Sequence, residues 1–526
     1  MRRTLPFILI IAIAIIARVA VFRGFAASDD ASYARVAWAI AQGHSPLSDA
    51  TVPPQYAGRL GITVPVALLF RVFGVHEWTL LIFPAFMSAA MLGLAYAFGR
   101  TFFSREAGLI TLAIFAVMPI DCSFATWLLS DTPSAVWAGG GILALVIGKR
   151  SARNSGKALA GLIAALCFGL SWLTRTQVAQ LAPFVLGALV LWSWRDRKNL
   201  WLAGPAAAGV LAIWLAEGFW YLSATGDFLY PLHAAEKIYA TDSQWYFTAG
   251  GVYGWAPGHY ALGLARRLLW KGPAGLLLNA DFALVPLAAL AAAAHALYWR
   301  RREFLFPAAL FLWSALVFNF GSASLRHYQP LPWMNSYMVP CLLPAAILAG
   351  GWLAWLFSSN GPVSRAEDRA AEAIAEHGPA AGHVPGENAR MRRERRFWAG
   401  LVCAGLALAA AFGLHQHMSQ GIGCPDTRQA AKAVSPDSDR PLYSDAMTLR
   451  GLEFFWGYSA KRPMRSFGHM RREDIPAGAE VLINPPEIQR MRDQIGYEPP
   501  PWTESPPKPW KLEQRWDGAA LYVVQP

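Results

Sequence analysis

The sequence predicts a mostly α-helical, polytopic membrane protein. Of its 526 residues, 55% are hydrophobic and only 15% are charged, whereas soluble domains average about 25% charged residues. Apolar stretches recur almost from end to end of the chain. The formal net charge of +12 comes from short Lys and Arg clusters between these stretches, a pattern typical of topology signals rather than of a nucleic-acid-binding face. Nucleic acid is therefore discarded as a partner.

The first apolar stretch, residues 5–22, follows Arg2 and Arg3. It is long enough to cross a bilayer core of about 30 Å, whereas the apolar region of a signal peptide usually has about 7 to 15 residues. We therefore expect an uncleaved first transmembrane helix with its basic N-terminus inside. Ten further spans are expected at residues 77–98, 107–120, 134–148, 158–173, 178–194, 200–221, 282–299, 304–320, 337–357 and 397–414.

Residues 61–73 are also apolar, but they are few and include Pro65 and Arg71. If they do not cross the membrane, the later basic clusters fall on the same side as Arg2 and Arg3. If they do cross, all of those clusters lie outside. The positive-inside rule therefore predicts a juxtamembrane helix at the outer surface for residues 61–73, and eleven spans in total.

This topology divides the chain into a transmembrane domain (1–414), with a cytoplasmic linker at 358–396, and a C-terminal domain (415–526). The linker is rich in Ala, Glu and Arg and carries no candidate site. Strand-like runs at 441–444, 480–484 and 519–524 indicate a small outer α/β domain. The five cysteines are scattered and predict neither a disulfide framework nor a zinc site; Cys122 and Cys424 are the one pair that could meet on the oxidising side.

The outer loops carry the candidate chemistry, beginning with the adjacent carboxylates Asp29 and Asp30 after the first span. A carboxylate at the membrane surface can act as a general base toward an attacking hydroxyl. The alternative is that Asp29 caps the helix expected after it, because Asp at an N-cap accepts backbone N–H groups. Asp131 precedes another span and Pro133, so capping competes with a site role there too.

Cations are scarce on the predicted outer face, and Arg59, Arg175 and Arg326 are the notable ones. Arg offers a fork of donors that suits phosphate, so the three could form an anion site. Separate anchoring at the lipid headgroups is the competing explanation for each.

The long outer segment 223–281 is rich in aromatic residues, which suit an interfacial belt or contacts to sugar rings. Within it, His233 and Lys237 are candidate substrate contacts. A divalent metal, with His233 as one candidate ligand, is left open.

Several short motifs in order give the chain a family resemblance from Thr4 to about Leu414. The motifs are Asp29-Asp30-x-x-Tyr33, Tyr56-x-x-Arg59-x-Gly61, Arg105-x-Ala107-Gly108, Ser130-Asp131-Thr132-Pro133, Leu173-Thr174-Arg175, Gly226-Asp227 and Tyr337-x-x-Pro340. Together they resemble the membrane glycosyltransferases of the GT-C fold that use lipid-linked sugars, the group that includes protein O-mannosyltransferases and the aminoarabinose transferase acting on lipid A.

The resemblance implies Asp29 as the catalytic base, with Asp30 in support and Asp131 as the second outer carboxylate. It implies donor-phosphate contacts from Arg59 and Arg175. The Arg that usually precedes Tyr337 is Ser336 here, and Arg326 is the proposed substitute. The predicted substrate-binding residues are Tyr33, Tyr56, His233, Lys237, Tyr328 and Tyr337.

The expected activity is transfer of a sugar from a polyprenyl-phosphate donor to an acceptor hydroxyl, with inversion at the anomeric centre. The acceptor could be lipid A or other lipopolysaccharide, a polysaccharide or a protein. The expected location is a bacterial inner membrane, with the site and the C-terminal domain on the periplasmic side. The alternatives are a transporter or flippase, in which intramembrane charges would line a path, and an envelope-assembly protein.

Overall fold

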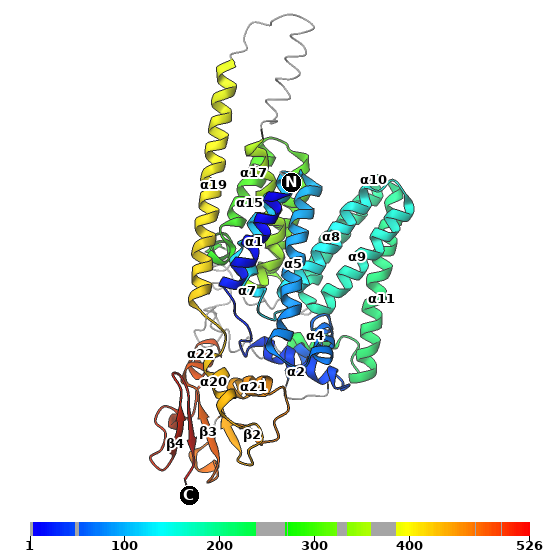
Figure 1. Cartoon of the computed structure of the whole chain (residues 1–526). Coiled ribbons are helices and arrows are strands. Elements are labelled where there is room, and N and C mark those ends of the chain that lie inside the picture. Colours follow the sequence, from blue (N-terminus) through cyan, green and yellow to red (C-terminus); the bar gives the residue numbers. More distant parts are fainter. Residues whose placement is uncertain are drawn as a thin grey trace, which may run out of the picture.

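The computed structural model describes residues 4–47, 52–237, 269–270, 272–322, 334–358, 385–468, 470–495 and 497–525. Most of these residues are helical and form a bundle, with a small sheet domain at one end (Figure 1). The predicted fold class, a mostly α polytopic protein with a small C-terminal α/β domain, is confirmed.

The bundle consists of long apolar helices, because in lipid a helix satisfies its own backbone hydrogen bonds. They are α1 (Leu5–Ala20), α5 (Glu77–Phe102), α6 (Arg105–Ala116), α8 (Asp131–Arg150), α9 (Asn154–Thr174), α10 (Ala182–Arg195), α11 (Leu200–Thr225), α15 (Val285–Tyr298), α16 (Leu305–Phe320), α17 (Val339–Phe357) and α19 (Pro385–Ser419). In the described part of the chain, seven segments, those containing α5, α9, α10, α11, α16, α17 and α19, are long and apolar enough to cross a membrane. The chain is thus a multi-pass membrane protein, and the count of eleven spans stays a prediction.

Helix α17 lies inside the bundle, with 14 of its 19 residues buried, and packs against α6, α8, α15 and α16. Helices α9, α10 and α11 form one flank, and α19 runs along the other flank down to the sheet domain (Figure 1). The charge of Arg18 in α1 is neutralised within the bundle. Its guanidinium lies 2.5 Å from the carboxylate of Asp121 in α7 (Pro119–Phe124) and donates to Ser88 of α5.

Basic loops meet at the end of the bundle away from the sheet domain. The ammonium of Lys157 donates to the carbonyl of Lys149 and to the side chain of Asn199, which joins the α8–α9 and α10–α11 connections. Arg150 donates to the carbonyl of Thr101 near the end of α5. We expect these basic clusters to lie on one side, and this packing agrees with that expectation. Which side of a membrane they face stays a prediction.

The opposite end of the bundle carries the short helices α2 (Asp29–Ala41), α3 (Pro54–Ala57) and α4 (Leu60–Phe73). Helix α4 packs against α2, α5 and α9 and lies with α2 beside the sheet domain (Figure 1). Its bounds agree with the helix expected at residues 61–73, and its juxtamembrane position stays a prediction.

The C-terminal domain has a five-stranded sheet in the order β2-β1-β3-β5-β4. The strands are β1 (Leu442–Ser444), β2 (Met464–Ser466), β3 (Glu480–Ile483), β4 (Lys511–Arg515) and β5 (Ala520–Val523), and the helices are α20 (Pro425–Ala433), α21 (Ala446–Phe455) and α22 (Pro485–Ile495). Strand β1 is parallel to β2 and β3, whereas β5 is antiparallel to β3 and β4. The three expected strand-like runs correspond to β1, β3 and β5. All five cysteines are free thiols, so Cys122 and Cys424 do not pair.

Candidate functional site

The two adjacent carboxylates at the start of α2 differ in what they contact. Asp30 is fully buried, and its two oxygens accept the backbone N–H groups of Ala26, Ser28 and Ala31 at 2.6, 2.7 and 3.0 Å. These bonds fix the turn that leads into α2, so Asp30 has a structural role, and the N-cap residue is Ser28 rather than Asp29. Burial, the largest effect, raises the pKa of Asp30 to about 6, although the three N–H groups oppose the shift.

Asp29 is only half-buried, and one of its oxygens accepts the hydroxyl of Tyr56 at 2.7 Å. Burial and the nearby Asp29 carboxylate raise the pKa of Tyr56 well above its usual value. The phenol therefore stays protonated and acts as a donor that orients the carboxylate. Of the three predicted catalytic carboxylates, Asp29 is the most accessible, because Asp30 and Asp131 are 0% and 5% exposed.

Arg59, the N-cap of α4, contacts the same tyrosine, Tyr56, that hydrogen-bonds Asp29. Its guanidinium donates to the hydroxyl of Tyr33 and to the hydroxyl of Ser130 at 3.1 Å. It also lies over the rings of Tyr33 and Tyr56, 5.6 and 5.5 Å from their centroids. Tyr56 thus contacts both Arg59 and Asp29, whereas Tyr33 contacts Arg59.

Arg175 reaches the same place from the C-terminal end of α9. Its guanidinium donates to Asp131 at 2.5 Å and to the hydroxyl of Ser130 at 3.3 Å. It lies over the ring of Tyr337, 4.2 Å from the centroid. Ser130 therefore accepts hydrogen bonds from both Arg59 and Arg175. The sequence places this serine in the motif Ser130-Asp131-Thr132-Pro133, but no role in the site was predicted for it.

These residues form one polar cluster, consisting of Asp29, Arg59, Asp131 and Arg175 with Tyr33, Tyr56, Ser130 and Tyr337. The two arginines and two carboxylates balance in formal charge. The cluster can therefore accept an anion near the guanidinium groups while leaving Asp29 accessible to a hydroxyl.

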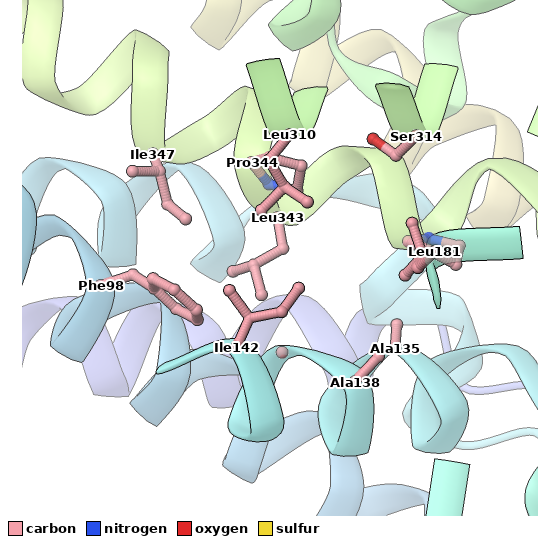
Figure 2. Close-up of a pocket in the computed structure, with 12 residues that line it drawn as sticks. Phe98, Ala135, Ala138, Ile142, Leu181, Leu310, Ser314, Leu343, Pro344 and Ile347 are labelled. Atoms are coloured by element: carbon pink, nitrogen blue, oxygen red, sulfur yellow. The ribbon is translucent and has the colours of Figure 1, made fainter. Parts of the chain in front are cut away.

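An apolar pocket lies inside the bundle (Figure 2). Ala135, Ala138 and Ile142 of α8 line one side, and Leu343 of α17 lies opposite with residues of α5 and α16. Ser314 contributes the one polar side chain among the residues that line it. Ala135 comes one helical turn after Asp131, so the polar cluster and the pocket share α8.

The other predicted contacts lie in the segment after α11 or outside the described residues. The ring Nδ1 of His233 is 2.7 Å from Asp227, and the side chain is 45% exposed. Lys237 is exposed at the end of the same described segment. Arg326 and Tyr328 fall outside the described residues. Within the described ranges, no group of three or more His, Cys, Asp or Glu side chains is arranged to hold a metal ion.

Comparisons with known proteins agree with this fold. Residues 64–220 match the family model of dolichyl-phosphate-mannose-protein mannosyltransferases, a range that contains Asp131 and Arg175 but begins after Asp29 and Arg59. No curated protein sequence matches the chain.

Two crystal structures of ArnT from Cupriavidus metallidurans share the fold over nearly the whole chain. The apo structure has a TM-score of 0.57 at 14% identity and covers 100% of this chain and 98% of ArnT. The structure bound to undecaprenyl phosphate has a TM-score of 0.57 at 16% identity and covers 99% and 98%. An oligosaccharyltransferase from Archaeoglobus fulgidus has a TM-score of 0.48 at 11% identity, with 98% of this chain and 74% of that chain covered.

The matched family is one of glycosyltransferases, and ArnT shows the fold that the sequence resemblance implied. The resemblance is confirmed: the chain is a membrane glycosyltransferase of the GT-C fold.

Proposed function

We propose that the protein transfers a sugar from a polyprenyl-phosphate donor to an acceptor hydroxyl at the end of the bundle that carries the C-terminal domain. The observation that carries the proposal is a half-buried carboxylate, Asp29, in one polar cluster with two arginines, with an apolar pocket that begins one turn of α8 beyond Asp131. Between Asp131 and Ile142, α8 rises about 16 Å at about 1.5 Å per residue. A phosphate group at the arginines and an isoprenoid chain in the pocket would match this spatial order of polar and apolar surfaces.

The leaving group fits the cluster. A polyprenyl phosphate departs as a weakly basic anion, so positive charge and hydrogen-bond donors stabilise it without a strong general acid. Arg59 and Arg175 supply those donors. Asp131 is held by Arg175 and orients that guanidinium, whereas Asp30 holds the turn before Asp29.

Asp29 takes the proton of the acceptor hydroxyl as its oxygen attacks the anomeric carbon. The bond from that carbon to the phosphate oxygen breaks, and its electron pair leaves with the phosphate. A single displacement of this kind inverts the anomeric centre. One base with a cation cluster suffices, in contrast to the two working carboxylates of a glycoside hydrolase.

The likeness to ArnT, one of whose structures contains undecaprenyl phosphate, supports a polyprenyl-phosphate donor. The positive-inside pattern supports a bacterial inner membrane with the cluster on the periplasmic side. The acceptor is a lipid such as lipid A, a polysaccharide or a protein, and Tyr337, His233, Lys237, Arg326 and Tyr328 remain candidate contacts.

Mass spectrometry of envelope glycolipids, polysaccharides and glycoproteins tests the proposal in cells with the protein, without it, and with Asp29→Asn. Asp196→Asn is the matched control, since Asp196 caps a short helix at the far end of the bundle. A product that lacks one sugar in both the deletion and Asp29→Asn cells is expected. Transfer at the parent rate by a folded Asp29→Asn protein would remove the base assignment, and unchanged products in the deletion would favour transport or assembly.

A further inference from the structure

The turn that precedes Asp29, residues 24–28, is held by the C-terminal domain. Three successive carbonyls in it accept hydrogen bonds from two arginines of that domain. Arg490 of α22 donates to the carbonyls of Ala26 and Ala27 at 2.7 and 3.1 Å. Arg428 of α20 donates to the carbonyl of Phe25 at 3.2 Å. The turn is therefore bonded to elements more than 390 positions away in the sequence.

Both arginines are themselves fixed. Arg428 forms a two-pronged ion pair with Glu77 at the start of α5, and Glu77 also accepts the N–H of Phe25 at 2.7 Å. Arg490 lies 2.7 Å from Glu487, one turn earlier in α22. Arg428 and Arg490, which donate to the turn, are thus held by contacts to the bundle and to the C-terminal domain respectively.

Aromatic packing also joins the turn to the C-terminal domain. The ring of Phe25 is fully buried and stacks on Phe454 of α21, with centroids 4.0 Å apart and planes 10° apart. Arg35 of α2 pairs with Glu453 of α21 at 2.8 Å. Helix α2, which begins with Asp29, therefore contacts the C-terminal domain through Arg35 and through Trp38, whose ring lies 5.1 Å from that of Tyr458.

The backbone of the turn needs this support. Ala27 has φ +52°, a left-handed conformation that costs a residue with a Cβ roughly 1 to 2 kcal/mol. Asp30 holds the turn from inside through the N–H groups of Ala26 and Ser28, and Arg490 holds the carbonyls from outside. Asp29 follows this turn directly, so the turn sets where its carboxylate points.

We propose that Arg490 is a positioning residue for the transfer reaction, through which the C-terminal domain holds the turn at residues 26–28 and aims the carboxylate of Asp29 at the acceptor. The inference rests on the proposed function, because it assumes that Asp29 is the base. It adds that the C-terminal domain, which lies outside the matched family range, completes the active site.

The expected effect falls on turnover rather than on donor binding. A displacement of about 1 Å in a catalytic group can lower the rate by about 100-fold, so Arg490→Ala is expected to lower kcat by about 10- to 100-fold. The donor KM should stay near that of the parent, since Arg490 makes no contact with Arg59 or Arg175 in the described structure. Arg490→Lys keeps the charge but not the two-carbonyl fork, and should restore part of kcat.

The experiment compares the purified full chain with Arg490→Ala, Arg490→Lys and Arg492→Ala. Arg492 is the matched control because it lies on the same helix, is exposed and pairs with Glu504 instead of the turn. Each variant is assayed for kcat, donor KM, thermal unfolding and binding of undecaprenyl phosphate. Reduced kcat with unchanged lipid binding in Arg490→Ala alone supports positioning. Parent kcat in a folded Arg490→Ala protein would overturn it.

A double-mutant cycle with Asp29→Glu tests whether Arg490 acts through Asp29. The longer side chain already displaces the carboxylate, so adding Arg490→Ala should lower kcat by clearly less than it does in the parent. Fully additive losses would show that Arg490 acts elsewhere. If Arg490→Ala does not fold, Arg490→Lys carries the same cycle.

A failure of the proposed function can be distinguished from a failure of the positioning role of Arg490. Unchanged products in the deletion contradict the proposed function, and parent activity in Asp29→Asn contradicts the base assignment, whatever Arg490 does. An inactive Asp29→Asn together with a fully active Arg490→Ala contradicts only the positioning role.

Discussion

Asp131→Asn should lower stability and strengthen binding of the donor lipid at the same time. Asp131 and Arg175 form an ion pair of 2.5 Å with side-chain exposures of 6% and 8%. Removing the charge of one partner leaves the other buried without compensation, which typically costs about 3 to 5 kcal/mol. Ser130 and Gln177 also accept from Arg175, at 3.3 and 2.7 Å, so we expect a loss near the lower limit, about 3 kcal/mol.

The gain in donor binding follows from charge. The cluster of Arg59, Arg175, Asp29 and Asp131 is formally neutral, and Asp131→Asn makes it +1. At an effective dielectric constant of about 20, a carboxylate about 8 Å from a phosphate repels it by about 2 kcal/mol. Removing that repulsion should tighten binding of undecaprenyl phosphate by about 30-fold, since each 1.4 kcal/mol corresponds to about tenfold.

The assay measures apparent Tm in detergent with and without undecaprenyl phosphate, together with the Kd of the lipid. Asp131→Asn should unfold several degrees below the parent without lipid and show the larger shift with it. The double variant Asp131→Asn/Arg175→Met should regain stability but bind the lipid weakly. A single variant with the Tm and Kd of the parent would refute the electrostatic reasoning.

Four other changes have distinct expected outcomes. Arg59→Ala should raise the donor KM by about 10- to 100-fold, the size of a lost charge-assisted contact, and leave the acceptor KM near the parent value; the reverse pattern would contradict its role. Tyr56→Phe should lower kcat by about fivefold, because one hydrogen bond of about 1 kcal/mol that orients Asp29 is lost; an unchanged kcat would mean that this bond does not matter for transfer. Ala138→Phe should fill the apolar pocket and weaken long-chain donors more than short-chain analogues, since each buried methylene contributes about 0.8 kcal/mol; equal losses for both would place the chain elsewhere. Burial raises the pKa of Glu487 to about 7, whereas an ordinary Glu in the unfolded chain has a pKa near 4.5. The folded protein therefore binds this proton more tightly than the unfolded chain, and the resulting stabilisation is present at low pH and is lost as pH rises through 7. Glu487→Gln should flatten the fall in apparent Tm between pH 5 and 8, and an unchanged slope would contradict this reasoning.

The fold class was predictable from the sequence, because a helix that crosses a lipid bilayer must be mostly apolar. An apolar stretch such as that of α5 has few other options than a spanning helix. Strands β1, β3 and β5 were also predictable, since they lie inside the sheet and contain apolar residues. Strand β4 was not predicted, because it lies at the sheet edge with all five residues exposed and has no apolar pattern.

Which of two adjacent carboxylates faces the site could not be decided locally. Capping was considered for Asp29, but the left-handed Ala27 turns the chain so that Asp30 receives the N–H groups of residues 26, 28 and 31. Arg18 was recognisable as a costly charge within a span, whereas its partner Asp121 lies 103 positions away. Contacts of this kind depend on packing that no short motif encodes.

The side chains of the polar cluster are held in place in two different ways. Arg175 and Asp131 lie at the ends of the long helices α9 and α8, which the bundle holds rigidly. Asp29 instead follows a strained turn whose carbonyls are bonded to the C-terminal domain. On the proposed function, Arg175 and Asp131 are fixed by the membrane bundle, whereas the position of the base Asp29 depends on how the C-terminal domain docks. Variants at this contact should therefore change turnover and acceptor use before they change binding of the donor lipid, and variants in α8 and α9 should do the opposite.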